Sequence, residues 1–459
     1  MKLRVVPSWL LLVTLLCLRW CALAGRNLGL TASVVTVAYS GGSIGMARRR
    51  YDIHVGDCTV VVAGTHLRCS TVPGVGANYT FEVTVDGVTS SPSNATLSYG
   101  APGINSVELV ELASAPTRGG AAVRIHGYNF GPDDAGTVIA AWASPSVMAS
   151  LEFPASACVV EQAHVTIRCI TGSSVGSKLT WRVAVEGQVN SAPVSVVSSP
   201  SITTVLLVNA THASTSGGTV LQVTGDNFGA FIQVVRVAVR MAAGDVVTQN
   251  CTFAVVYTVV RCKLPAGIGR IWGVMITVLD QSVDFEASDL WYAPPVVSGV
   301  NPNRWGTDLN GTSVQLVGSG FGSPALSSYV QVSATAASGC AGSVAGILSG
   351  RNVIVRSDGD LSFELHTVFP HVVRRWELQV SVAGQALASG PLVIDTSTPE
   401  LVALAFNTAP NSTHNFLTLV GTDFGDSVTG CVDDASVSVG GAPCDALSMA
   451  VVRVSRLEL

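Results

Sequence analysis

The stretch Gly127-Tyr128-Asn129-Phe130-Gly131 decides the fold, because it returns three more times at nearly constant spacing. The first glycines of the four copies are 98, 93 and 103 residues apart, which is the length of one β-sandwich domain. The third position holds Asn, Asn, Gly or Asp, the residue types that best tolerate a left-handed backbone. We therefore predict a tight turn in each copy, with the Phe in a core. The later copies are Gly225-Asp226-Asn227-Phe228-Gly229, Gly318-Ser319-Gly320-Phe321-Gly322 and Gly421-Thr422-Asp423-Phe424-Gly425.

A larger pattern surrounds each copy. An apolar segment that starts with proline opens each repeat, as suits a first strand at a sheet edge. Period-two alternation before the turn then predicts a strand with one buried face. A strand led by an aromatic residue closes the repeat, and we predict a core position for this residue instead of a ligand-stacking platform. The opening prolines are Pro102, Pro200, Pro295 and Pro399. The inward-facing residues before the turn are Val123/Ile125, Leu221/Val223, Val314/Leu316 and Leu417/Leu419. The aromatic residues that lead the closing strand are Phe81, Trp181, Trp272 and Trp376.

Composition agrees with an all-β array of sandwich modules. Hydrophobic residues make up 48% of the 459 residues and charged residues only 12%, with 46 Gly and 20 Pro, which suits strands and turns. Domain one is expected to be degenerate, since only Gly41-Gly42-Ser43-Ile44-Gly45 lies near the place of its turn phrase. Domain five is expected to be truncated. The predicted boundaries are 1–24 for a signal peptide, then 25–100, 101–199, 200–293, 294–397 and 398–459.

The first 24 residues fit a secretory signal. Lys2 and Arg4 form a positive start, residues 9–18 are apolar, and Ala22-Leu23-Ala24 is a small-x-small cleavage pattern before Gly25. No later segment has 18 consecutive apolar residues, so a membrane anchor is expected only in a region beyond Leu459. The sequence predicts a protein that is secreted or displayed on the outer face of the plasma membrane.

Cysteine spacing supports an oxidising compartment. Three pairs have the same ten intervening residues, which places the thiols across a hairpin within disulfide reach. Metal binding is the weaker alternative, because no further ligand lies at suitable spacing within a pair. Cys431 can pair with Cys444, which would leave Cys340 free or bonded to another chain. Ser357 stands where domain four would need a second cysteine. The three pairs are Cys58/Cys69, Cys158/Cys169 and Cys251/Cys262.

Six Asn-x-Ser/Thr sites beside a signal sequence predict a glycosylated surface. Removal of residues 1–24 leaves 22 basic and 30 acidic residues, a net charge of −8, which opposes nucleic-acid binding. The basic run Arg48-Arg49-Arg50 is expected to be a solvated loop. The acceptor residues are Asn78, Asn94, Asn209, Asn250, Asn310 and Asn411.

No catalytic, metal or cofactor site is predicted. Gly41–Gly45 and Gly172-Ser173-Ser174-Val175-Gly176 match the Gly-x-Ser-x-Gly pattern of hydrolases, but no helix is readable behind either. The carboxylate pairs are expected to be solvated turns instead of calcium or acid/base sites. These pairs are Asp133-Asp134, Asp358/Asp360 and Asp433-Asp434.

The Pro start, the glycine turn, the Gly-x-x-Phe-Gly phrase, the paired cysteines and the closing aromatic strand together resemble the IPT/TIG domain family. The resemblance covers almost the whole chain after residue 24 and is closest to extracellular arrays such as those of plexins and fibrocystin-like proteins. It implies tandem immunoglobulin-like domains and a non-catalytic role in protein binding or cell adhesion. Two alternatives stay open, namely a structural spacer of a larger protein and a carbohydrate-binding module array. The ligand, whether protein or glycan, and the oligomeric state are not determined by the sequence. Very short linkers predict a semi-rigid rod with roughly 35–40 Å per module.

Overall fold

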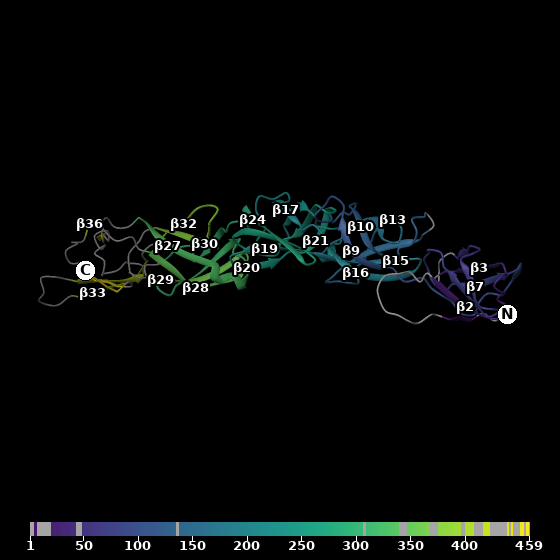
Figure 1. Cartoon of the computed structure of the whole chain (residues 1–459). Coiled ribbons are helices and arrows are strands. Elements are labelled where there is room, and N and C mark those ends of the chain that lie inside the picture. Colours follow the sequence, from purple (N-terminus) through teal and green to yellow (C-terminus); the bar gives the residue numbers. More distant parts are fainter. Residues whose placement is uncertain are drawn as a thin grey trace.

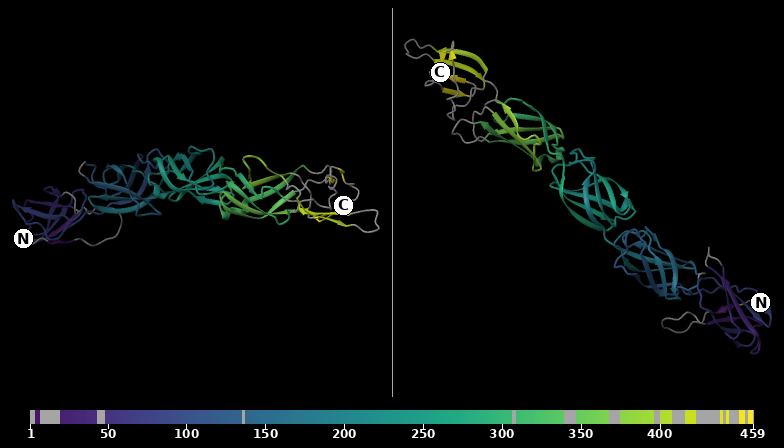
Figure 2. Two further views of the ribbon diagram at one scale, coloured as in Figure 1. Left: turned by 180° about the vertical axis from the view of Figure 1, so that it is seen from behind. Right: turned by 90° about the horizontal axis from the view of Figure 1, so that it is seen from above.

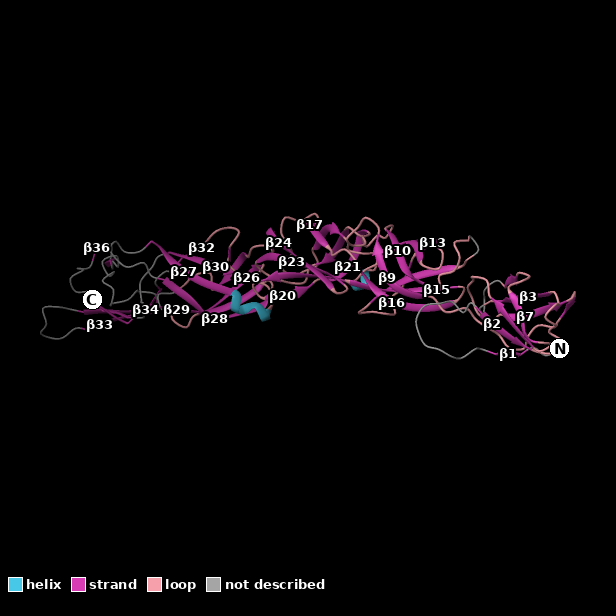
Figure 3. Cartoon of the chain, in the orientation of Figure 1, coloured by secondary structure: helices cyan, strands magenta, loops and turns pink. Residues whose placement is uncertain are grey.

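The computed structural model is a rod of five β modules joined end to end (Figures 1 and 2). The structure describes residues 4–6, 20–42, 48–134, 137–305, 309–338, 347–367, 375–395, 400–407, 416–422, 438–439, 442–443, 450–453 and 456–458. Within these residues almost all regular structure is strand, and the two helices are short 3₁₀ turns, η1 (Ile232–Val234) and η2 (Pro324–Tyr329) (Figure 3). The predicted all-β, immunoglobulin-like class is confirmed.

Modules 2 and 3 show the complete plan, which is two four-stranded antiparallel sheets packed face to face. Module 2 has the sheet orders β13-β14-β10-β9 and β12-β11-β15-β16, and module 3 has β17-β18-β22-β21 and β20-β19-β23-β24. The strands of module 2 are β9 (Gly103–Leu109), β10 (Ala122–Tyr128), β11 (Ile139–Pro145), β12 (Phe153–Pro154), β13 (Ser156–Gln162), β14 (Thr166–Ile170), β15 (Lys178–Val185) and β16 (Gln188–Val196). Those of module 3 are β17 (Ser201–Leu207), β18 (Val220–Asp226), β19 (Val235–Met241), β20 (Gly244–Val247), β21 (Gln249–Val255), β22 (Val259–Lys263), β23 (Arg270–Val278) and β24 (Gln281–Trp291).

Module 1 repeats this plan with the sheets β1-β2-β6-β5 and β4-β3-β7-β8, while module 4 joins its strands into one eight-stranded sheet. Module 1 contains β1 (Arg4–Val6), β2 (Trp20–Ala24), β3 (Val35–Gly41), β4 (Arg49–Ile53), β5 (Cys58–Val62), β6 (His66–Ser70), β7 (Thr80–Val85) and β8 (Val88–Thr89). Module 4 contains β25 (Val296–Asn301), β26 (Ser313–Ser319), β27 (Val330–Ser338), β28 (Ile347–Ser357), β29 (Asp360–Thr367), β30 (Arg375–Val382), β31 (Gln385–Ala386) and β32 (Leu392–Asp395).

The described part of module 5 has the sheet β33-β34-β38-β37 and the hairpin β35-β36. Its strands are β33 (Glu400–Asn407), β34 (Phe416–Thr422), β35 (Ser438–Val439), β36 (Ala442–Pro443), β37 (Ala450–Arg453) and β38 (Arg456–Glu458). Phe424, Gly425, Asp433, Asp434 and the three cysteines Cys340, Cys431 and Cys444 lie outside the described residues.

The repeated turn has the predicted backbone. Asn129 and Asn227 both have φ 62°, and Gly320 has φ 83°, so the third position is left-handed in the three copies that are fully described. The last glycine is left-handed too, at Gly131, Gly229 and Gly322. Phe130, Phe228 and Phe321 are fully buried, and so are the inward-facing residues of β10, β18 and β26 that lead into the turns. The turn therefore anchors each sandwich through a buried ring.

Module 1 differs from the sequence-based boundary. The structure places Trp20–Ala24 in strand β2, which pairs with β6, and Cys21 and Leu23 lie in the core of this module. The turn that follows is Gly25-Arg26-Asn27-Leu28-Gly29, with Asn27 at φ 59° and Gly29 at φ 89°. Module 1 thus has its own copy of the phrase with Leu28 in place of Phe, and the Gly-x-x-Phe-Gly pattern does not match it for this reason.

Two further expectations are corrected by strand register. In module 4 the second-cysteine position is filled by Phe363, because Phe363 faces Val314 as Cys169 faces Val123, whereas Ser357 ends the preceding strand.

Phe81, Trp181 and Trp376 are buried as predicted, but Trp272 is 57% exposed. The register of β23 with β24 shifts between Ile271 and Gly273, and Ile271 takes the inward place. A β-bulge of this kind re-aims a side chain.

Candidate functional site: the joints between modules

An aliphatic side chain from each of the first three modules is inserted into the core of the next one. Val75 belongs to the hydrophobic cluster of modules 2 and 3, Val175 lies inside the same cluster where these modules meet, and Ile268 belongs to the cluster of module 4. All three are buried. Each of these residues packs in the hydrophobic core of the next module, so successive modules share part of their apolar interior.

The receiving residue is the last glycine of the repeated turn. A methyl group placed on Gly131 would lie 2.5 Å from Cγ1 of Val75, and one on Gly322 would lie 2.6 Å from Cγ2 of Ile268. Gly229 receives Val175 in the same way. These glycines have positive φ, so a side chain there would be both strained and in collision. The turn phrase therefore shapes the joint as well as the module's own core.

A glutamine adds the same hydrogen bond at each of these joints. Nε2 of Gln188 donates to the carbonyl of Tyr99 at 3.0 Å, and Nε2 of Gln385 donates to the carbonyl of Tyr292 at 3.0 Å. Gln281 donates to Ser199 Oγ at 3.1 Å and to the carbonyl of Val197 at 3.5 Å. Each glutamine begins the strand after a hairpin turn and reaches the end of the preceding module. Because the same contact recurs at three joints, we infer that the joint is a specific feature of the repeat.

Tyrosine hydroxyls hold the loops that carry the inserted residues. In module 1, Tyr79 donates to the carbonyl of Val75 at 2.6 Å, and Tyr99 donates to the carbonyl of Val72 at 2.7 Å. In module 3, Tyr292 donates to the carbonyl of Pro265 at 2.9 Å, and burial raises the pKa of Tyr292 to about 12. These hydroxyls therefore stay protonated donors at any physiological pH.

The joint between modules 1 and 2 also contains an ion pair. Arg49 lies 3.0 Å from Glu186, whose side chain is 5% exposed, and Glu186 accepts the amide of Val138 at 2.9 Å. The expectation of a solvated loop for Arg48-Arg49-Arg50 is wrong for Arg49, which begins β4 and is largely buried. Burial lowers the pKa of Arg49, but Tyr51, Glu186 and Asp134 outweigh this and raise it overall.

The next two joints replace this ion pair by polar contacts. Asp280 accepts the amide of Ser177 at 2.8 Å and also the hydroxyl of Ser177. Asp358 accepts the hydroxyl of Thr215 at 2.8 Å and the amide of Gly322 at 2.8 Å. Asp358 was expected in a solvated turn with Asp360, and the structure places it between modules 3 and 4 instead.

One position next to the turn varies from joint to joint. His164, Tyr257 and Asp358 each accept, through their carbonyl, the amide of the turn's Phe. The Tyr257 hydroxyl donates to Ser173 Oγ of the preceding module at 3.2 Å. His164 is half-buried, and its Nδ1 has no hydrogen-bond partner among the described residues. Burial lowers the pKa of His164. In module 2 the position that corresponds to Tyr257 and Asp358 therefore carries an imidazole whose pKa is lowered by burial.

The hydrolase-like pattern at Gly172–Gly176 is part of a joint. Its central serine, Ser174, is buried, and strand β15 follows without a helix. Ser173 donates to the carbonyl of Thr117 at 3.1 Å. The second match ends in residues 43–45, which lie outside the described residues. The described residues contain no group of three His, Cys, Asp or Glu side chains arranged for a metal ion.

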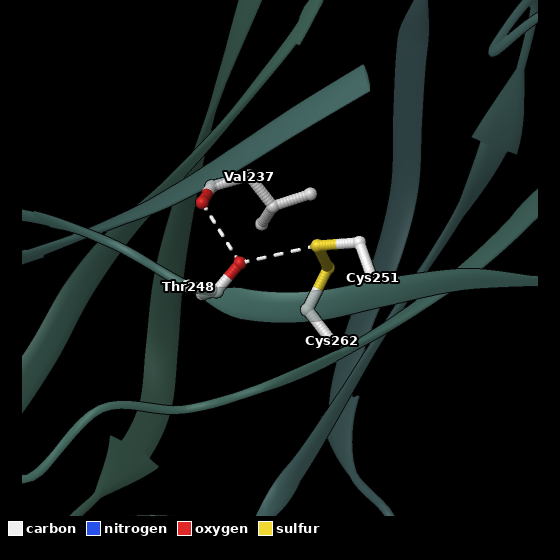
Figure 4. Close-up of a disulfide and its surroundings, with 4 residues drawn as sticks. All are labelled: Val237, Thr248, Cys251 and Cys262. Atoms are coloured by element: carbon white, nitrogen blue, oxygen red, sulfur yellow. Dashed lines mark hydrogen bonds between the residues drawn. A yellow bond between two sulfur atoms is a disulfide. The ribbon is translucent and has the colours of Figure 1, made fainter. Parts of the chain in front are cut away.

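The three predicted hairpin disulfides are present in the structure, as Cys58–Cys69, Cys158–Cys169 and Cys251–Cys262. Figure 4 shows the last of them, where Thr248 donates to the carbonyl of Val237 at 2.9 Å and lies 3.4 Å from Cys251 Sγ. Cys21, which was expected to leave with a leader, is a buried thiol, and burial raises its pKa to about 11. The five sequon asparagines that are described, Asn78, Asn94, Asn209, Asn250 and Asn310, are all exposed, and Asn411 lies outside the described residues.

Sequence reasoning missed the joint residues, although a signal was present. A Val-Gly or Ile-Gly pair starts six residues after the second cysteine of the first three modules, at Val75, Val175 and Ile268. The glutamines also recur with the repeat, 93 and 104 residues apart. Repetition alone, however, does not say which module a residue contacts.

No family model matches the chain, and no curated protein matches it. Solved structures that match the chain include the extracellular region of plexin A4, at 12% identity over 82% of this chain and 46% of that chain, with a TM-score of 0.20. This chain thus corresponds to less than half of that region. Invasin, a bacterial integrin-binding protein, matches at 11% identity over 84% and 78%, with a TM-score of 0.21. Three fibronectin-type domains of chicken CNTN1 match at 11% identity over 65% and 99%, with a TM-score of 0.19. Among the described residues no helix is long and apolar enough to cross a membrane.

Proposed function

We propose that this chain is a non-catalytic extracellular rod of IPT/TIG-type modules that presents binding surfaces for protein contact or cell adhesion. The observation that carries the proposal is the joint, which recurs three times with an inserted aliphatic residue and a glutamine hydrogen bond. A joint built in this way holds successive modules in a fixed relation. The joint buries the ends of the modules and leaves the sheet faces and side loops available for contact with other molecules.

Secretion is supported by the disulfides and by the five exposed sequons. Disulfides persist in oxidising compartments and are rare in the cytosol. Each should stabilise its module by about 3 kcal/mol through closure of a short loop. The IPT/TIG assignment is supported by the Pro start, the left-handed Asn-Phe-Gly turn and the hairpin cystine, which occur together in modules 2 and 3.

The carbohydrate-binding alternative gains one specific observation. Trp272 is an exposed aromatic residue of module 3, with 57% of its surface accessible. An exposed Trp is also a residue type that is enriched in protein-binding hot spots. Module 3 is therefore the first place to search for a ligand of either kind.

The test uses the full chain, secreted from eukaryotic cells and coupled to beads. Adhesion predicts that coated beads attach to cells or to one another, and that Trp272→Ala reduces attachment while Val247→Ala, a change at another exposed residue of module 3, does not. A glycan array distinguishes the carbohydrate alternative. The binding role would be overturned if the coated beads attach to nothing while X-ray scattering shows that the protein is folded and extended. That result would favour the structural-spacer alternative.

A further inference from the structure

Strand β2 is an integral part of module 1. It pairs with β6 at five successive positions, from Trp20 opposite Ser70 to Ala24 opposite His66. Cys21 and Leu23 point into the core, while Ala22 and Ala24 are half-exposed. In modules 2, 3 and 4 the corresponding strands β10, β18 and β26 also lie beside the hairpin strand and run directly into the turn. Alternation in a strand thus explains the small residues at 22 and 24.

The turn after β2 matches the other turns in spacing and in hydrogen bonding. Gly25 precedes Gly127 by 102 residues, within the range of the other repeats. Gly25 donates its amide to Thr65 at 2.9 Å and Leu28 donates to Gly64 at 3.0 Å. Module 2 makes the same bonds from Gly127 to Val165 and from Phe130 to His164. Leu28 is fully buried, as Phe130 is.

A cut between Ala24 and Gly25 would therefore remove a central strand from a finished sandwich. Strand β6 would keep β5 but lose β2 along its whole length, so it would become an edge strand. Leu67 and Cys69, which face Leu23 and Cys21, would lose part of their cover. The chain would then begin within the turn, with a charged amine in place of the Gly25 amide. An edge strand exposes a row of backbone donors and acceptors on its open side.

We propose that the Ala24–Gly25 bond stays intact in the folded protein, and that residues 20–24 are a permanent strand of module 1 and not the end of a removed leader. The small-x-small pattern at Ala22, Leu23 and Ala24 is then the sequence of a strand, with its inward residue between two outward ones. The inference concerns this bond only, and it does not depend on the ligand or on the adhesive role.

The experiment expresses the full chain from Met1 in eukaryotic cells, recovers the disulfide-bonded protein and digests it with trypsin. Arg19 and Arg26 flank the bond, so an uncut chain yields the peptide of residues 20–26, which carries Cys21 as a free thiol. We expect this peptide in stoichiometric amount. A mature amino terminus at Gly25 in folded protein would overturn the proposal.

Ala24→Gln is the matched variant. Position 24 is half-exposed in β2, so glutamine fits the strand, whereas the residue before a leader cleavage site must be small. We expect the same amino terminus and the same yield as for the unchanged chain. A loss or displacement of the amino terminus in this variant would show that the bond is a cleavage site.

A second comparison separates folding from processing. Two chains are secreted behind the same removable leader, one starting at Trp20 and the other at Gly25. We expect amide hydrogen exchange in β6 to rise at least 100-fold in the chain that starts at Gly25, with modules 2 to 4 unchanged. Equal protection of β6 in both chains would overturn the proposal.

Discussion

Val175→Ala should loosen the joint between modules 2 and 3 while leaving both sandwiches folded. Val175 is completely buried where the shared core crosses from one module to the next. The change removes two methyl groups, which is worth about 1.6 kcal/mol at about 0.8 kcal/mol for each carbon. Gly229, opposite Val175, has no side chain that could fill the space, so a cavity penalty raises the total to about 2 kcal/mol. The open population of the joint should increase about 30-fold.

The amide of Ser177 reports this opening directly, because it donates to Asp280 of the next module. Under conditions where closing is fast, its hydrogen exchange should accelerate about 30-fold in Val175→Ala, while amides in the middle of β15 keep their rates. Val159→Ala is the matched control, since Val159 is an exposed valine of the same module. If the Ser177 rate is unchanged in Val175→Ala, or rises equally in the control, the reasoning about the joint fails.

Three further predictions follow from burial and register. Trp181→Ala should cost about 3–5 kcal/mol and lower the melting temperature in calorimetry, whereas Trp272→Ala should change stability by less than about 0.5 kcal/mol; equal effects would contradict the bulge in β23. Because burial lowers the pKa of His164, the folded state binds fewer protons than the unfolded state, so module 2 should lose stability as the pH falls through the ordinary histidine range. Hydrogen exchange at the Phe130 amide, which donates to the His164 carbonyl, should show this, and His164→Asn, which suits the φ of 62°, should remove it. Replacing Cys251 and Cys262 together by serine should destabilise module 3 by about 3 kcal/mol in denaturant titration, and a loss below 1 kcal/mol would contradict loop closure as its main contribution.

Local pattern was sufficient for much of the fold. The period near 100 residues, the Asn-Phe-Gly turn and the three equal cysteine spacings correctly predicted an all-β array, left-handed turns and hairpin disulfides. Each of these features depends on residues close together in the chain, so the restrictions on φ and the hairpin geometry are readable from sequence.

Long-range register decided the rest. Trp272 was expected in the core from its parity, but a single-residue bulge reverses parity and leaves no trace in composition. An apolar strand and the end of a leader have the same residue types, so the sequence does not show that residues 20–24 pair with β6.

What the sequence by itself determined is the module, its turn and its cystine, since these follow from local backbone chemistry. What only the tertiary structure decided is which module each repeated residue serves. Val75, Val175 and Ile268 look like ordinary core residues of their own modules, and they are buried in the joint or in the core of the next one. The physical reason is that burial depends on what lies opposite a side chain, and for these residues that is a glycine about 55 residues further along the chain.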